Sequence, residues 1–83
     1  MKVEIYTKAE CSLCDEAKAV IETVRGRVPF ELVEHDIEAD PELYQRFRCD
    51  IPVVFIEGQK AFKHRLDAAT LEARLRRGEP QRG

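Results

Sequence analysis

The sequence predicts an α/β fold in which the elements follow in the order β-α-β-α-β-β-α. A mixed four-stranded sheet with helices on both faces is the architecture that fits this order. Strand-like segments at Lys2–Tyr6 and 29–37 flank a segment of helical periodicity, which predicts a right-handed parallel crossover. The most apolar stretch, Ile51–Ile56, precedes the turn pair Glu57-Gly58 and a short polar segment, which predicts an antiparallel hairpin.

The first half of the chain supplies a strand, a helix and a second strand. In Lys2–Tyr6, Val3 and Ile5 lie on one side, as in a half-buried strand. The helix is predicted to end near Gly26, because glycine accepts the backbone conformation of a helix C-terminus. Its buried side is formed by apolar residues at helical spacing, namely Leu13, Ala17, Val20, Ile21 and Val24. The segment 29–37 is rich in strand-forming residues and follows as the second strand.

A short helix and a hairpin come next. Asp40-Pro41-Glu42 is typical of a helix start, with aspartate as N-cap and proline in the first turn. Ile51–Ile56 is predicted to be a central strand covered on both faces. Residues 59–64 are polar and short, which favours an edge strand.

The last predicted element is a helix capped by Asp67. Its inward side would carry Leu71 and Leu75, and Gly78 with Pro80 would end it. We therefore expect one domain over residues 1–78 and a flexible tail over residues 79–83.

Composition limits the classes of function. The chain has 83 residues, of which 43% are hydrophobic and 36% charged, as expected for one small globular domain with a charged surface. The net charge of -2 gives no basic excess for nucleic acid. Since we find neither a membrane-spanning apolar run nor a signal peptide, we expect a cytoplasmic protein that acts as a monomer away from membranes.

The stretch TKAECSLCDEAK contains the strongest chemical signal, because Cys11 and Cys14 are three positions apart. Such a pair is redox-active, half of a metal site, or simply buried. A metal site would need further ligands, and only Cys49, His35 and His64 are available, with no second close pair among them. A CxxC pair where a strand leads into a helix favours the redox interpretation.

The two cysteines are predicted to have different roles. At the start of the helix, Cys11 would meet unpaired N–H groups and the positive end of the helix dipole, which lower the pKa of a thiol placed there. Cys11 is therefore predicted to be the nucleophile. Cys14, one turn further along and more buried, would resolve the mixed disulfide. Lys8, three residues before Cys11, would add positive potential.

The motif YTKAECSLC after the first strand, together with IPVVF before a hairpin and a last helix, resembles the glutaredoxin family of the thioredoxin fold. The resemblance extends from Met1 to about Arg77 and is closest to short, divergent bacterial glutaredoxin-like proteins. It implies a dithiol-disulfide oxidoreductase that reduces disulfides of proteins or small molecules. It implies no bound cofactor, with glutathione or another thiol reductant as co-substrate.

The resemblance also implies a substrate groove beside Cys11. Lys8, Ile51 and Pro52 would line it, and Pro52 would be cis, although the sequence by itself favours a trans peptide bond. We add three further substrate-binding residues: the two that lie between the cysteines, and the aspartate near the last helix that matches the family. These are Ser12, Leu13 and Asp67.

Several positions depart from the family pattern and leave an alternative open. Ser12 and Leu13 replace a proline and an aromatic residue, Asp50-Ile51 replaces Thr-Val, and residues 63–66 replace a glycine pair. The alternative is a binding module for a thiol ligand, for a protein partner or for an iron-sulfur cluster bridged between two chains. Cys49 is either an extra thiol that traps Cys11 or a small residue packed under its loop.

Overall fold

The computed structural model describes residues 1–78 and contains the predicted strands and helices in the predicted order. Their bounds are β1 Lys2–Thr7, α1 Ser12–Arg25, β2 Glu31–Asp36, α2 Pro41–Phe47, β3 Val53–Ile56, β4 Gln59–Lys63 and α3 Ala68–Gly78. A 3-10 helix, η1, adds Ile37–Ala39 between β2 and α2. The expected tail, 79–83, lies outside the described residues.

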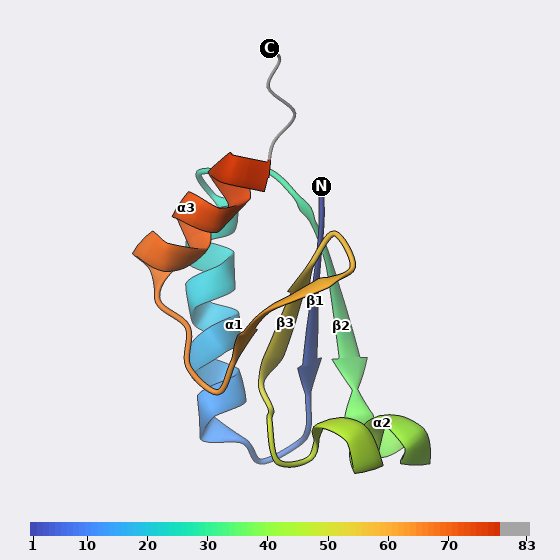
Figure 1. Ribbon diagram of the computed structural model, residues 1–83. Helices are drawn as coiled ribbons and strands as arrows, with labels where there is room; N and C mark the ends of the chain where they lie inside the picture. Colours follow the sequence, from blue (N-terminus) through green and yellow to red (C-terminus); the bar gives the residue numbers. More distant parts are fainter. Residues whose placement is uncertain (79–83) are drawn as a thin grey trace.

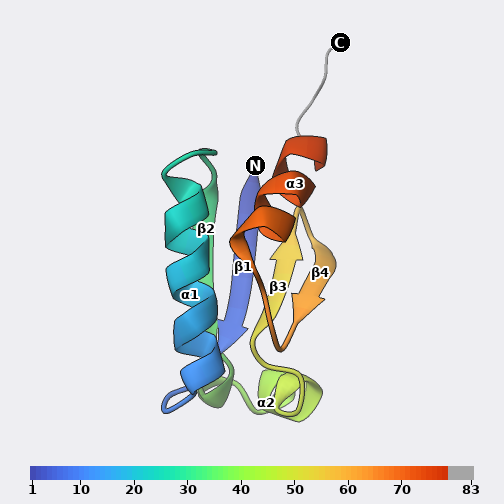
Figure 2. The same cartoon turned by 90° about the vertical axis from the view of Figure 1, so that its left-hand side faces the viewer.

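The sheet has four strands in the order β2-β1-β3-β4 (Figures 1 and 2). β1 pairs with β2 in parallel, with Val3 opposite Leu32. β3 runs antiparallel to both β1 and β4, and Ile5 lies opposite Val54 in the β1–β3 pair. The mixed sheet, the parallel crossover, the hairpin and the edge position of β4 are all confirmed.

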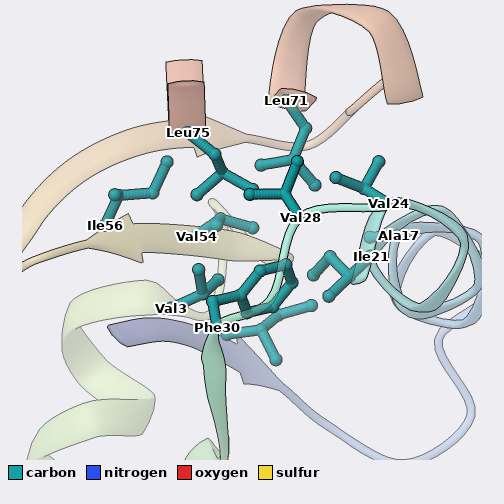
Figure 3. Packing of buried hydrophobic residues seen from close by; sticks show 11 residues of the cluster. Val3, Ala17, Ile21, Val24, Val28, Phe30, Val54, Ile56, Leu71 and Leu75 are labelled. Atoms are coloured by element: carbon teal, nitrogen blue, oxygen red, sulfur yellow. The ribbon is translucent and has the colours of Figure 1, made fainter. Parts of the chain in front are cut away.

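Helices α1 and α3 lie side by side on one face of the sheet (Figures 1 and 2). Figure 3 shows their apolar side chains meeting those of β1 and β3. Ile5, Ile21 and Leu71 are all 0% exposed in this cluster. We call it the large core; its buried members are Val3, Ile5, Ala17, Ile21, Val24, Val28, Phe30, Val54, Ile56, Leu71 and Leu75.

Among residues 1–78, the helical cover of the second face is confined to its lower end, where α2 lies on the side of the sheet opposite α1 and α3 (Figure 1). Phe47 of α2 packs there with the rings of Tyr6 and Phe55, with ring centroids 4.7 and 6.1 Å from its own. Lys2, at the other end of β1, is exposed. Helices on both faces are confirmed, but a seven-residue α2 is too short to cover the whole second face.

Two predicted strand bounds change, and one element is added. β3 begins at Val53 rather than at Ile51, because the N–H of Ile51 donates to the carbonyl of Phe47 and Pro52 has no N–H. β4 ends at Lys63, since His64 turns the chain with φ at 67°. η1 was not predicted from the sequence. It starts where the carboxylate of Asp36 accepts the N–H of Glu38 at 2.9 Å, an N-cap.

Candidate active site

Cys11 and Cys14 meet at the start of α1, at the end of the sheet where β1 finishes (Figure 1). Their sulfur atoms are joined as a disulfide, and their Cα atoms are 5.2 Å apart, within the usual range for such a bond. Cys11 is half-buried, whereas Cys14 is 0% exposed. Only one of the two sulfurs is therefore accessible to a substrate.

Cys11 is the N-cap of α1. Its backbone is extended, and its Sγ accepts the N–H of Cys14 at 3.2 Å. A sulfur in this position also lies at the positive end of the helix dipole, so negative charge on it is stabilised. The helix begins at Ser12, so the predicted position of Cys11 at the helix N-terminus is confirmed.

The dithiol belongs to a second, smaller cluster of buried residues, which we call the small cluster. Cys14 packs there with Ile51, which precedes Pro52 in the chain. The other buried members are Ile37, Phe47 and Val53, and Tyr6, Cys11, Leu43 and Phe55 pack against them. The small cluster therefore brings the CxxC turn and the Ile51–Pro52 segment to the same end of the sheet.

The peptide bond between Ile51 and Pro52 is cis, as the resemblance implies, and Pro52 is fully buried. The carbonyl of Phe47 holds the preceding turn by accepting the N–H groups of Asp50 at 2.8 Å and of Ile51 at 3.1 Å. From the other side, the backbone N–H of His64 donates to the carbonyl of Pro52 at 2.9 Å. The segment is thus fixed by α2 on one side and by the end of β4 on the other.

A cavity of about 510 Å³ opens where the start of α1 faces the β4–α3 connection. Leu13 and Asp67, both predicted as substrate-binding residues, line it together. The full lining is Leu13, Glu16, Ala17, Phe62, His64, Arg65, Leu66, Asp67 and Thr70. The wall therefore combines apolar and charged side chains, a composition found in small-molecule sites.

Asp67 has a structural role in the cavity wall. Its carboxylate accepts the backbone N–H and the hydroxyl of Thr70, each at 2.8 Å. These hydrogen bonds lower the pKa of Asp67, because they stabilise its ionised form. The prediction that Asp67 caps the last helix is confirmed.

The structure does not place every predicted site residue in this cavity. Lys8 is half-buried in the loop between β1 and α1, and Ser12 is exposed on the first turn of α1. Neither residue lines the cavity, and neither do Ile51 and Pro52, which belong to the neighbouring segment described above. Four of the predicted residues therefore form two groups, Leu13 with Asp67 in the cavity and Ile51 with Pro52 in the neighbouring segment, whereas Lys8 and Ser12 belong to neither.

Cys49 is exposed, which excludes the interpretation that it is packed under its loop. His35 lies on the second face, with its Nε2 atom 2.9 Å from a carboxylate oxygen of Glu4. Among residues 1–78, no three His, Cys, Asp or Glu side chains gather in a group that could hold a metal ion. Within the same residues, no helix is long and apolar enough to cross a membrane.

Sequence reasoning missed two parts of this region. His64, named from the sequence only among the available metal ligands, hydrogen-bonds to the segment that ends at Pro52. Phe62 and Leu66 supply apolar walls of the cavity. One sequence signal could have identified His64. Residues 63–66 replace the family's glycine pair, and glycine is the residue that adopts a positive φ, which His64 has here.

Comparison with known proteins identifies the family. The model of the Glutaredoxin-like domain (DUF836) matches residues 2–76. The "Glutaredoxin-like protein YDR286C homolog" of Dictyostelium discoideum is 30% identical over 73 residues, which cover 81% of this chain and 68% of that protein.

Solved structures agree on the fold. Target protein XcR50 of X. campestris superposes with a TM-score of 0.79 at 22% identity, covering 93% of this chain and 99% of that one. Thioredoxin 1 of Thermosipho africanus gives a TM-score of 0.69 at 18% identity, covering 93% and 92% of the two chains. The chain therefore belongs to the glutaredoxin-like domain family and has the thioredoxin fold.

Proposed function

We propose that this protein is a dithiol-disulfide oxidoreductase that reduces disulfides of proteins or small molecules. One observation carries the proposal: a half-buried Cys11 whose sulfur accepts the Cys14 N–H at the N-terminus of α1, next to a fully buried Cys14. This asymmetry supplies one sulfur that a substrate can reach and a second that only its partner can reach. That is what nucleophile and resolving thiol require.

In the first step of the reduction, the thiolate of Cys11 attacks one sulfur of the substrate disulfide. The substrate S–S bond breaks, a Cys11–substrate bond forms, and the departing thiolate takes a proton from water. The charge on Cys11 before attack is favoured by the Cys14 N–H and by the helix dipole. Asp15, in the first turn of α1, is exposed to solvent and offsets this only weakly.

In the second step, the thiol of Cys14 loses its proton and attacks the sulfur of Cys11. The mixed disulfide breaks, the substrate leaves as its second thiol, and the Cys11–Cys14 disulfide forms, which is the state of the present structure. An external thiol, either glutathione or a dithiol reductant, must return two electrons before the next cycle. Each turnover thus reduces one substrate disulfide and oxidises either one equivalent of a dithiol or two equivalents of glutathione.

The surroundings of the dithiol support a substrate with a peptide chain. The fixed segment at Ile51–Pro52 lies on one side of Cys11, and the cavity lined by Leu13 and Asp67 lies along α1. A disulfide within a protein could contact both, whereas a very small disulfide would contact the dithiol alone. We therefore expect protein disulfides to be bound more tightly than small ones.

The test is the reduction of insulin with dithiothreitol as electron donor, comparing the wild type with Cys11→Ser and Cys14→Ser. Cys11→Ser should be inactive, and its helix should persist because serine is a good N-cap. Cys14→Ser should stop at the mixed disulfide and turn over slowly, by external thiol alone. Cys49→Ser is the matched control and should match the wild type, because it removes an exposed thiol and keeps the backbone carbonyl.

A Cys11→Ser variant as active as the wild type would show that another group is the nucleophile. Loss of activity in Cys49→Ser would instead show that the Cys49 thiol takes part in the reaction. An inactive wild type with a visible absorption band after anaerobic purification would favour the binding module with a cluster over the enzyme.

A further inference from the structure

His64 occupies an unusual backbone conformation directly after β4. Its φ is 67°, and the N–H of Arg65 donates to the carbonyl of Lys63 at 2.8 Å across it. A hydrogen bond between residues two apart around a positive φ is the pattern of a classic γ-turn, which is rare because it is strained. Glycine would adopt this conformation without the steric cost that a histidine Cβ brings.

The histidine makes three hydrogen bonds to the segment that ends at Pro52. Its backbone N–H lies 2.9 Å from the carbonyl of Pro52 and 3.3 Å from that of Asp50. Its ring Nε2 lies 2.9 Å from the carbonyl of Cys49. Because a carbonyl only accepts, Nε2 must carry the hydrogen and donate it, which both the neutral ring and its cation can do.

The same residue also lines the cavity that contains Leu13 and Asp67. His64 is thus in contact with both groups of predicted site residues, the cavity and the segment before Pro52. A change at His64 would therefore affect the cavity lining and the hydrogen bond to the Cys49 carbonyl together.

We infer that His64 is a positioning residue for protein substrates. Its ring holds the Cys49–Pro52 segment in the orientation that receives the peptide chain next to the attacked disulfide, and its strained backbone is kept for the sake of that contact. His64 acts through this segment and does not touch the reacting sulfurs. The inference depends on the proposed disulfide reduction and adds a determinant of its specificity.

The experiment compares three variants at this position, with insulin and with the small hydroxyethyl disulfide as substrates. His64→Ala removes the ring donor and keeps the Cβ, His64→Gln keeps an amide donor of similar reach, and His64→Gly removes both donor and strain. The loss of one net hydrogen bond should raise the KM for insulin about fivefold in the Ala and Gly variants. The kcat should stay within about twofold of wild type, and the small disulfide should be reduced at the wild-type rate.

Two further readouts separate positioning from support of the fold. His64→Gln should have a KM for insulin close to the wild-type value. His64→Gly should be at least as stable as the wild type while binding insulin less tightly. Glu57→Gly is the matched control, because Glu57 also has a positive φ, of 51°, in the turn at the far end of the hairpin (Figure 1). It should relieve strain and leave both substrates unaffected.

A wild-type KM for insulin in His64→Ala and His64→Gly would overturn the inference while the proposed function stood. Equal losses with insulin and with hydroxyethyl disulfide would also overturn it, because they would indicate a general disturbance of the dithiol. Failure of the wild type to reduce either substrate would instead remove the proposed function.

Discussion

The large core and the small cluster differ in what they enclose. The large core is closed between the sheet and helices α1 and α3 and contains only apolar side chains. The small cluster lies where the short α2 meets the sheet, includes Cys14, and has the half-buried Cys11 packed against it. One helix serves both, because the first turn of α1 contributes the cysteines to the small cluster while Ala17 to Val24 face the large core.

The two clusters are therefore expected to have different roles, the large core in the stability of the fold and the small cluster in the chemistry of the dithiol. The large core has more buried members than the small cluster and packs along α1, whose N-terminus lies at the end of the sheet (Figure 1). The small cluster only has to hold the Ile51–Pro52 segment near the dithiol. Substitutions in the two clusters should therefore have different effects, and the following variants test that expectation.

The largest effect on stability is expected for Leu71→Ala in the large core. Leu71 is 0% exposed, and truncating such a leucine costs about 2–5 kcal/mol because transfer energy is lost and a cavity remains. Insulin reduction per folded molecule should stay close to the wild-type value. Urea unfolding and activity measured on the same sample check this, with Ile21→Val as a milder variant costing about 1 kcal/mol. A fall in the activity of the folded protein would contradict the expectation that the large core affects stability alone.

A smaller effect on stability, accompanied by a loss of function, is expected for Phe47→Leu in the small cluster. The ring of Phe47 packs on Tyr6 and is 5% exposed, so its replacement should cost about 1–2 kcal/mol. Leucine keeps the backbone carbonyl that accepts the N–H groups of Asp50 and Ile51, but repacking around the smaller side chain should shift the end of α2 and so loosen the segment before Pro52. The KM for insulin should rise while Leu71→Ala leaves it unchanged. Equal KM values in the two variants would show that both clusters support the site alike.

The smallest effect concerns Asp67 and depends on pH. Its pKa is lowered in the folded protein by the bonds from Thr70, so the unfolded state takes up a proton first as the pH falls. The stabilisation by Asp67 is therefore complete above its unfolded pKa, near 3.8, and is lost as the pH falls through the folded value. Asp67→Ala should lower the melting temperature at pH 7, and the difference from the wild type should shrink as the pH falls below 3.8 and through the lowered folded pKa of Asp67.

Asp67→Asn is the matched control for this titration. Asparagine also caps a helix but does not ionise, so this variant should keep its relative stability at acid pH. A gap between wild type and Asp67→Ala that does not change with pH would mean that ionisation of the carboxyl group adds nothing to its role as a cap. Thermal unfolding at several pH values, followed by circular dichroism, is the measurement.

Local patterns predicted the elements well because each depends on nearby residues. The spacing from Ala17 to Val24 indicated α1, and Asp67 indicated the start of α3, since a cap acts within one turn. The cis form of Pro52 came from the resemblance, because nothing in the neighbouring residues distinguishes it from trans. The pairing of Cys11 with Cys14 at the helix N-terminus followed from their spacing and from the preceding strand.

The parts that were missed depend on contacts between distant residues. His64 has its positive φ because the chain must leave β4 and meet the Cys49 carbonyl, fifteen positions earlier. The partial cover of the second face depends on where α2 packs, which periodicity within seven residues does not determine. The cavity forms between α1 and the β4–α3 connection, and no single segment of the sequence contains it.

The most direct test of the account is to identify the sulfur that attacks a disulfide. Reduced Cys14→Ser protein, mixed with one equivalent of hydroxyethyl disulfide at neutral pH and quenched with acid, should carry the adduct on Cys11. The exposed Cys49 provides the comparison within the same molecule, because it is accessible but lies outside a helix N-terminus. Peptide mass mapping that finds the adduct on Cys11 well before any on Cys49 agrees with the account. Equal or preferential labelling of Cys49 would contradict it.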